Sequence, residues 1–233
     1  MPRLPLALSV PHAGLAIPPE VAGNLLLTPD EIAADGDVGA DAIYTPLARH
    51  VAAFHKAGIA RAFVDPNRAA DDFGKDGVVK THTCWDIPIY REPLGQATIQ
   101  GMLAHYYRPY HDTLTGFSHN SAILMGIDCH TMATHGPPVG PDPGSRRPFI
   151  CLGNARHTSC PKAWLEDLAE LLYQEFGVDI ALNTPFAGGY ITRHYGRHKP
   201  WLQLEWSRTL EPDPAEKSAG LLRALQAWCG SRA

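Results

Sequence analysis

The apolar run at residues 122–132 most strongly constrains the fold of this chain, because it ends in an Asp-x-His pair. The run is short, and a glycine and an aspartate interrupt it, so it predicts a buried β-strand rather than a helix. Side chains two residues apart on a strand point to the same side, so Asp128 and His130 should project together. In open α/β sheets, ligands bind at the carboxyl ends of the strands. The run therefore predicts either a ligand site at this edge or a structural histidine that pairs with its neighbouring aspartate.

Strand-like and helix-like patterns alternate along the rest of the chain. The predicted strands cover residues 4–10, 59–64, 122–132, 149–152, 178–182 and 201–206, and the predicted helices cover residues 28–35, 41–58, 99–120, 164–176 and 214–229. Pro109 is expected to kink its helix, and residues 133–148, rich in glycine and proline, are expected to form a long loop. This alternation predicts an α/β layer sandwich with a mostly parallel or mixed sheet.

Composition limits the kinds of protein that the chain can be. A length of 233 residues favours one domain over residues 1–233, and 45% hydrophobic with 19% charged residues is typical of a globular protein. A net charge of −4 gives no basic field for nucleic acid and no attraction to a membrane surface. No long apolar window and no signal peptide is evident. Five scattered cysteines predict free buried thiols in a reducing cytoplasm.

Polar side chains collect where four of the predicted strands end. They are His12, residues 65–68, residues 128–130 and Glu205, and Arg193 follows a Gly-Gly turn. Any one of them could be a cap or a surface residue. Buried strands do not need a histidine, an arginine and a glutamate at their ends, so the coincidence across four strands predicts a functional site.

Two histidines and one carboxylate form the ligand set of a hydrolytic zinc site that keeps one position open for water. His12 and His130 are the natural pair, and Asp37 is the preferred carboxylate. Asp41 and Asp35 are the alternatives for the carboxylate. In a second interpretation, Asp35 and Asp37 only cap the helix that follows them, because a carboxylate stabilises a helix N-terminus. We expect one zinc ion, although such sites also accept iron, cobalt or nickel.

A hydrolytic metal site also needs a base, and Glu205 on its strand fits this role. The alternative for Glu205 is an ion pair with Arg208. Asn67 and Arg68 could hold a substrate carboxylate, and the alternative is a β-turn with an exposed arginine. Arg193 is a candidate partner for a second negative group or for the oxyanion of the tetrahedral intermediate.

Six motifs taken together resemble the N-formylglutamate amidohydrolase (N-formylglutamate deformylase) family, which is itself similar to the zinc carboxypeptidases and to the aspartoacylase and succinylglutamate desuccinylase group. The motifs lie at residues 9–14, 37–40, 64–68, 126–131, 188–196 and 203–205. They span nearly the whole chain, and their joint order is more specific than any one of them. The resemblance implies a phosphorylase/hydrolase-like α/β fold, a three-layer sandwich with a mixed, mostly parallel sheet, and a zinc amidohydrolase.

The resemblance also implies roles for individual residues. In the related deacylases, the second zinc-binding histidine lies in an Asp-Leu-His-Asn strand end, which matches His130. Their Asp-Leu-Asn-Arg motif, which holds the substrate α-carboxylate, matches residues 65–68, and their catalytic glutamate on a late strand matches Glu205. Their first zinc motif is His-x-x-Glu, whereas this chain has Leu15 three residues after His12. The carboxylate ligand must therefore come from elsewhere in the chain.

The expected function is zinc-dependent hydrolysis of the N-acyl amide of a small acidic amino acid. N-formyl-L-glutamate is the leading substrate, with formate and L-glutamate as products and histidine breakdown as the pathway. One alternative is another N-acyl amino acid or a small peptide in the same metal site. The other is a metal-free module that binds an acidic metabolite through Arg68 and Arg193.

Overall fold

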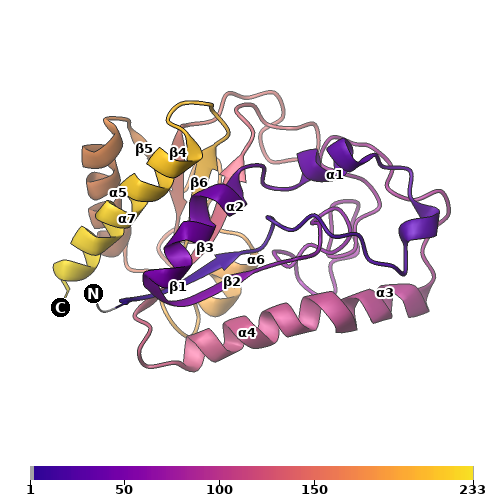
Figure 1. The fold of residues 1–233 in the computed structure, drawn as a ribbon, viewed down its shortest axis with the longest axis horizontal. Coiled ribbons are helices and arrows are strands. Elements are labelled where there is room, and N and C mark those ends of the chain that lie inside the picture. The colour runs from indigo at the N-terminus through magenta and orange to yellow at the C-terminus, as the bar shows by residue number, and fades with distance from the viewer. Residues whose placement is uncertain (1–2, 233) are drawn as a thin grey trace.

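The computed structural model describes residues 3–232 and contains a six-stranded sheet in the order β2-β1-β3-β6-β4-β5 (Figure 1). The strands are β1 (Leu4–Val10), β2 (Val51–Lys56), β3 (Met125–Met132), β4 (Ile150–Gly153), β5 (Ile180–Leu182) and β6 (Trp201–Ser207). The first four strands in this order are parallel, whereas β4 runs antiparallel to β6 and parallel to β5. The sheet is therefore mixed and mostly parallel, as the sequence predicted.

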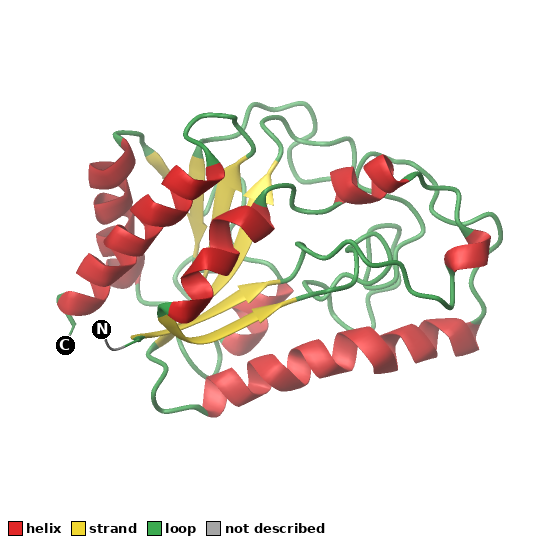
Figure 2. Ribbon diagram, in the orientation of Figure 1, coloured by secondary structure: helices red, strands yellow, loops and turns green. Residues whose placement is uncertain are grey.

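Helices cover both faces of this sheet (Figure 2). The helices within residues 3–232 are η1 (Ala22–Asn24), α1 (Pro29–Asp35), α2 (Ala40–Tyr44), η2 (Thr45–Arg49), α3 (Gln96–Met102), η3 (Leu103–Tyr107), α4 (Arg108–His119), α5 (Lys162–Phe176), α6 (Tyr190–Tyr195) and α7 (Pro214–Gly230), and not all of them lie on the sheet. On one face, α2, α5 and α7 pack through buried side chains such as Tyr44, Leu168 and Trp228. On the other face, α4 and α6 pack through Leu114 and Ile191. The architecture is thus the three-layer α/β sandwich that the sequence predicted.

Local signals in the sequence set several element boundaries. Thr28 caps α1, because its side chain accepts a hydrogen bond from the backbone N–H of Glu31. The Glu31 carboxylate in turn accepts one from the backbone N–H of Thr28 at 2.7 Å, which completes a capping box. Gly177 ends α5 in the left-handed conformation with φ +63°. Strand β1 has the predicted bounds.

The helix predicted over residues 41–58 is confirmed only over its first part and is wrong from residue 50 onward. This stretch forms the end of α2, the 3₁₀ helix η2 and the strand β2. Its apolar residues are still used, since Ile43 and Leu47 are buried against the sheet. After His50 the chain pairs with β1 instead of continuing the helix, because tertiary pairing overrides a weak local helix preference.

The strand predicted over residues 59–64 is also wrong. Ile59 and Ala60 form only isolated bridges to the segment that follows β1. Residues 57–95 as a whole contain no helix or strand. The polar group at residues 65–68 therefore enters the site from an irregular segment and not from a strand end.

The long helix on the second face contains an irregularity near Pro109. A π-helical turn, η3, separates α3 from α4, and Pro109 lies in the first turn of α4. This widened turn lies directly before α4, whose second residue, Pro109, has no N–H to donate, so the helix is irregular next to the residue that was predicted to disturb it. Among residues 3–232, no helix is both long and apolar enough to cross a bilayer.

The carboxyl ends of β1, β3 and β6 meet at one edge, because these strands are parallel neighbours. Ser9 pairs with Asp128, and His130 pairs with Glu205. His12 follows the end of β1 by two residues. The sheet thereby brings side chains from three distant parts of the chain to one place.

Candidate metal centre and active site

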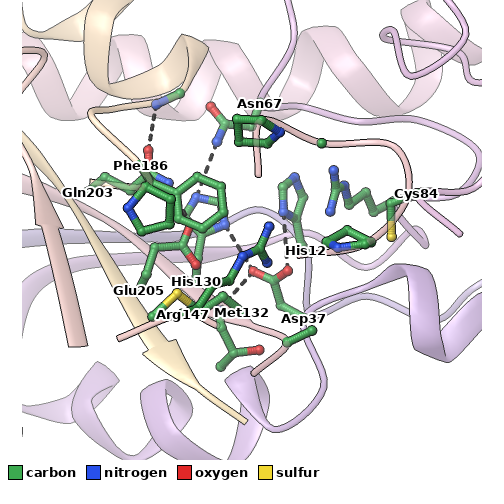
Figure 3. A pocket seen from close by; sticks show the side chains of 18 of the residues that line it. His12, Asp37, Asn67, Cys84, His130, Met132, Arg147, Phe186, Gln203 and Glu205 are labelled. Carbon is green, nitrogen blue, oxygen red and sulfur yellow. Dashed lines mark hydrogen bonds and ion pairs between the residues drawn. The ribbon is translucent and has the colours of Figure 1, made fainter. Parts of the chain in front are cut away.

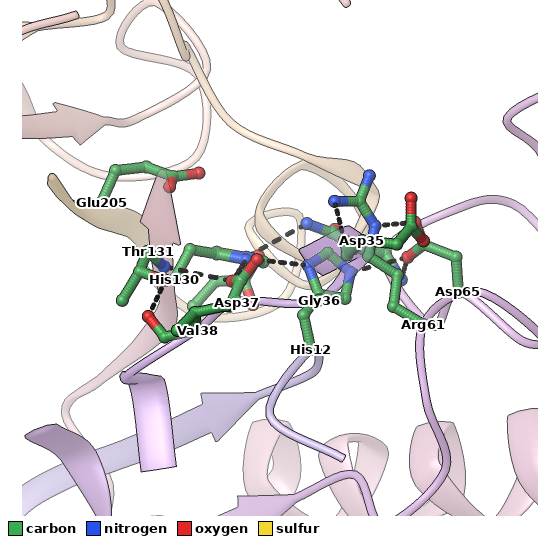
Figure 4. Close-up of polar contacts among 12 residues, drawn as sticks. His12, Asp35, Gly36, Asp37, Val38, Arg61, Asp65, His130, Thr131 and Glu205 are labelled. Carbon is green, nitrogen blue, oxygen red and sulfur yellow. Dashed lines mark hydrogen bonds and ion pairs between the residues drawn. The ribbon is translucent and has the colours of Figure 1, made fainter. Parts of the chain in front are cut away.

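His12, Asp37 and His130 each offer one ligand atom, and these atoms all lie within 4.8 Å of one another (Figure 4). Nδ1 of His130 lies 2.9 Å from Oδ2 of Asp37, and Nδ1 of His12 lies 3.5 Å from Oδ1 of Asp37. All three residues are buried. Two imidazole nitrogens and one carboxylate in this arrangement match the three protein ligands of a hydrolytic zinc site.

An aspartate carboxylate lies within 3.0 Å of the other ring nitrogen of each histidine. Nε2 of His12 lies 2.8 Å from Oδ1 of Asp65, and Nε2 of His130 lies 3.0 Å from Oδ2 of Asp128. Metal-binding imidazoles usually donate this second N–H to a carboxylate, which fixes the ring and makes the free nitrogen a better ligand. Both Nδ1 atoms are left facing Asp37, so the residues present fit a metal ion.

Asp37 is held by backbone groups as well as by the histidines. The backbone N–H of Thr131 donates to Oδ2 of Asp37 at 3.1 Å, and the backbone N–H of Asp37 donates to the carbonyl of His12 at 3.0 Å. Burial alone would raise the pKa of Asp37, but the charges and hydrogen bonds of His12 and His130 outweigh it and hold this pKa well below its usual range. The carboxylate is therefore ionised, as a metal ligand must be.

The two alternative carboxylates lie elsewhere. Asp35 accepts hydrogen bonds of 2.9 and 3.1 Å from the buried ammonium of Lys80. Asp41 is exposed and pairs with Lys56. The interpretation that Asp35 and Asp37 cap the next helix is wrong, because the start of α2 has no side-chain cap.

Glu205 faces the same cavity from β6 (Figure 3). Nε2 of Gln203 donates to its Oε1 at 2.6 Å, and no ion pair to Glu205 forms within residues 3–232. The alternative pairing with Arg208 is therefore wrong. Burial raises the pKa of Glu205, because the ionised carboxylate has lost most of its water. A carboxylate with a raised pKa is a stronger base at neutral pH.

Asn67 and Arg68 also line the cavity, but protein groups already occupy much of both side chains. Oδ1 of Asn67 accepts a hydrogen bond from the backbone N–H of Ile191 at 2.9 Å, and its Nδ2 lies 3.2 Å from Nε2 of His130. Arg68 donates to the carbonyl of Asp76 at 2.8 Å and also to its carboxylate. The β-turn of the alternative interpretation is present, since the backbone N–H of Arg68 donates to the backbone carbonyl of Asp65 at 3.3 Å.

Arg193 lies on α6 at the rim of the cavity and is exposed. Within the described part of the chain it forms no ion pair, and its guanidinium donates to the carbonyl of Gly188. The other arginines of the cavity each have a carboxylate within 4.0 Å, as Arg61 has Asp65. Arg193 is therefore the cavity arginine whose charge is left for a ligand.

The cavity has a volume of about 410 Å³, which suits a small molecule. The metal-ligating group, which consists of His12, Asp37 and His130, lines this cavity together with Glu205. The apolar side chains of Trp85, Met132, Val139 and Phe186 also line it. Trp85, Val139 and Phe186 come from loops, and sequence reasoning missed them because an apolar loop residue carries no periodic signal, whereas Met132 is the last residue of β3.

Sequence reasoning also missed the roles of Asp65 and Gln203. Asp65 belonged to a predicted cluster, but its pairing with His12 depends on the path of an irregular segment. Gln203 precedes Glu205 by two residues on the same strand, so both point to one face, and this spacing could have identified it.

The chain matches the model of the N-formylglutamate amidohydrolase family over residues 4–210. It belongs to this family. Curated relatives include the N-formylglutamate deformylase of Pseudomonas aeruginosa, which is 29% identical over 97% of this chain and 90% of that protein. The N-formylglutamate deformylase of Pseudomonas putida is 28% identical over 99% of this chain and 95% of that protein. The chain is therefore a hydrolase that acts on an amide.

Two solved structures share the fold. The N-formylglutamate amidohydrolase from Ralstonia eutropha aligns with a TM-score of 0.79 and 23% identity over 97% of this chain and 92% of that chain. A gene product of Agrobacterium tumefaciens aligns with a TM-score of 0.74 and 17% identity over 98% of this chain and 92% of that chain. At these identities the likeness is one of fold.

Proposed function

We propose that this member of the family hydrolyses N-formyl-L-glutamate to formate and L-glutamate in a metal-dependent reaction. The observation that carries the proposal is the convergence of His12, Asp37 and His130 on one point, with Glu205 lining the same cavity. The names of the curated relatives support the substrate. The proposal includes histidine breakdown as the pathway and the cytoplasm as the compartment, and five buried free cysteines fit a reducing environment.

His12, Asp37 and His130 would hold one zinc ion. Asp65 and Asp128, which lie beside the two histidines, would orient their rings. When bound, zinc supplies Lewis-acid polarisation of the amide carbonyl and lowers the pKa of water. Because this ligand set also accepts other divalent metals, elemental analysis of the purified protein tests the assignment. One zinc per chain is the expected result.

Glu205 is the proposed proton carrier. Its carboxylate takes a proton from the attacking water and returns it to the amide nitrogen as the C–N bond breaks, so that the amine leaves uncharged. The raised pKa of Glu205, caused by burial, suits both halves of this transfer. The hydrogen bond from Gln203 to Oε1 fixes the carboxylate and leaves Oε2 for the proton.

The proposed ligands of the substrate's negative groups are Arg68, Asn67 and Arg193. Arg193 is supported by its lack of an ion pair within residues 3–232, and it would meet a second carboxylate or the oxyanion. Arg68 would use Nη1, because its Nε and Nη2 already bond to Asp76. Asn67 would use Nδ2, because its Oδ1 already accepts a hydrogen bond from the backbone N–H of Ile191.

Glu205→Gln tests the proposal, because it keeps the shape of the side chain and removes the base. We expect kcat to fall by about 10²- to 10⁴-fold while the metal content is unchanged. Glu166→Gln is the matched control, since Glu166 is an exposed carboxylate on α5. Wild-type turnover by the Glu205 variant would remove the proposed base.

A substrate panel separates the leading substrate from its alternatives. N-formyl-L-glutamate should have the highest kcat/KM when compared with N-acetyl-L-glutamate, N-formyl-L-glutamine and short peptides. A better peptide or acetyl substrate would move the assignment to another amide in the same site. A protein without stoichiometric metal and without turnover would favour the binding module that recognises acids through Arg193.

A further inference from the structure

Arg208 connects the segment that carries Asp37 to the end of β3. Its guanidinium donates to the carbonyl of Gly36 and, at 3.4 Å, to the carbonyl of Ala34. It also donates to the side chain of Thr131 at 3.3 Å and to the carbonyl of Thr131 at 3.4 Å. Figure 4 shows Asp37 and Val38 beside Thr131. One side chain therefore holds two of the three segments that supply the metal ligands, the one that carries Asp37 and the end of β3.

The base of the Arg208 side chain is itself fixed. Arg208 follows β6 directly, and its backbone N–H donates to the carbonyl of Met132 at 2.9 Å, which extends the β3–β6 pairing by one step. The guanidinium thus reaches from the rigid sheet to the chain that leaves α1. The last carbonyls of a helix lack hydrogen-bond partners within the helix. A cation that donates hydrogen bonds to them is also favoured by the helix dipole.

Arg208 supports Asp37 without competing for its lone pairs. Nη2 of Arg208 lies 3.6 Å from Oδ1 of Asp37, which is within ion-pair range but too long for a hydrogen bond. The guanidinium donors point instead at backbone carbonyls and at Thr131. Only an arginine presents a rigid fork that spans two segments in this way, because the ammonium of a lysine is a compact point charge.

We propose that Arg208 is a positioning residue for the metal, and this inference rests on the proposed function. It holds the backbone at residues 34–37 so that Asp37 can join His12 and His130 around one ion. It acts through that backbone and through its charge, and it does not bind the substrate. Removing Arg208 should therefore weaken metal binding itself, before any effect on turnover is considered.

The test measures metal affinity. Co²⁺ is titrated into metal-free protein in competition with a chelator, and the visible absorption of the bound Co²⁺ reports its coordination. Arg208→Met should bind Co²⁺ about 10- to 100-fold more weakly than wild type, with an altered spectrum, as for other residues that orient metal ligands. Arg208→Lys should be weakened at least threefold, because it keeps the charge but reaches only one segment.

Arg147→Met is the matched control. Arg147 is a partly buried arginine that lines the same cavity, but it donates two hydrogen bonds to Asp142, at 2.8 and 2.7 Å, and forms no hydrogen bond or ion pair with His12, Asp37 or His130. Its Co²⁺ affinity should stay within threefold of wild type. Wild-type affinity in folded Arg208→Met or Arg208→Lys protein would overturn the role of Arg208 alone. Failure of the wild-type chain to bind Co²⁺ or Zn²⁺ would overturn the metal site and this role together.

Discussion

His130 and Glu205 lie on neighbouring strands of the sheet, whereas Asp65 and Arg68 lie on residues 57–95, which contain no helix or strand. Both regions contribute side chains to the same cavity. The strands position their residues through backbone pairing and through the apolar cluster shared with α2, α5 and α7. The irregular segment has no such ladder, so something else must fix its side chains.

Paired charges fix the side chains of this irregular segment, residues 57–95. The ammonium of Lys80, which is 0% exposed, lies 2.9 Å from Asp35 and 2.7 Å from Asp76. Arg61 donates to Asp65 at 3.0 Å, and Asp65 in turn holds His12. A buried charge is costly unless it is paired, so these residues hold one another in place. The comparison teaches that stability and site geometry are coupled in the irregular segment and separable in the sheet.

The largest stability effect should come from Lys80→Met. This change leaves the buried Asp35 and the partly buried Asp76 without their shared cation, which should lower the free energy of unfolding by about 3–5 kcal/mol. Urea denaturation of the metal-free protein measures it. Lys56→Met is the control, because Lys56 pairs with the exposed Asp41 and should cost less than about 1 kcal/mol. Equal losses in the two variants would show that the irregular segment does not depend on its buried charges.

A cavity in the sheet region should lower stability without changing the metal site. Leu168 on α5 is fully buried, so Leu168→Ala should cost about 2–5 kcal/mol of unfolding free energy. Its Zn²⁺ affinity should equal that of wild type at a temperature where the variant is folded. Leu210→Ala is the control, since Leu210 is 89% exposed and should change stability by less than about 0.5 kcal/mol. A tenfold loss of metal affinity in Leu168→Ala would break the proposed separation.

The sheet was largely predictable from the sequence because its signals are local. The apolar run before His130 forms β3. The alternation that places Gln203 and Glu205 on one side of a strand is present in β6. His12 was chosen by its residue type just past a predicted strand, Asp37 was chosen from the acidic stretch between two predicted helices, and the structure brings both to His130. In each case, the pattern needs only a few neighbouring residues.

The irregular segment could not be predicted in the same way. Residues 59–64 carry an apolar run, and Phe63 and Val64 are indeed buried, but they pack in a second cluster with Met102 and Leu103 instead of joining the sheet. An apolar pattern indicates burial and not the partner that buries it. The contacts of Arg208 and of Lys80 were invisible for the same reason, since they depend on which distant segments meet.

Two matched substitutions compare how the two histidines are oriented. Asp65→Asn and Asp128→Asn each remove the carboxylate that holds Nε2 of one histidine. His130 is also fixed by its strand, whereas His12 follows β1 in a turn. Zn²⁺ affinity should therefore fall about 100-fold in Asp65→Asn and about 10-fold in Asp128→Asn, the two ends of the range for such partners. Chelator competition measures both, and equal losses would mean that the strand adds nothing to the orientation.

The smallest expected effects come from two helix caps of the same type, one on the helix that precedes Asp37 and one on a helix that packs on the sheet. Thr28 caps α1, which leads into the Asp37 segment, and Asp213 caps α7 on the sheet, each with a reciprocal bond from a glutamate. Thr28→Ala and Asp213→Ala should each lower the unfolding free energy by about 1 kcal/mol, because cap energies are local. The Asp213 variant should keep wild-type Zn²⁺ affinity, whereas the Thr28 variant should lose a measurable part of it, since fraying of α1 loosens the chain before Asp37. Unchanged Zn²⁺ affinity in both variants would show that only the buried charges around Lys80 couple the stability of the protein to the geometry of the metal site.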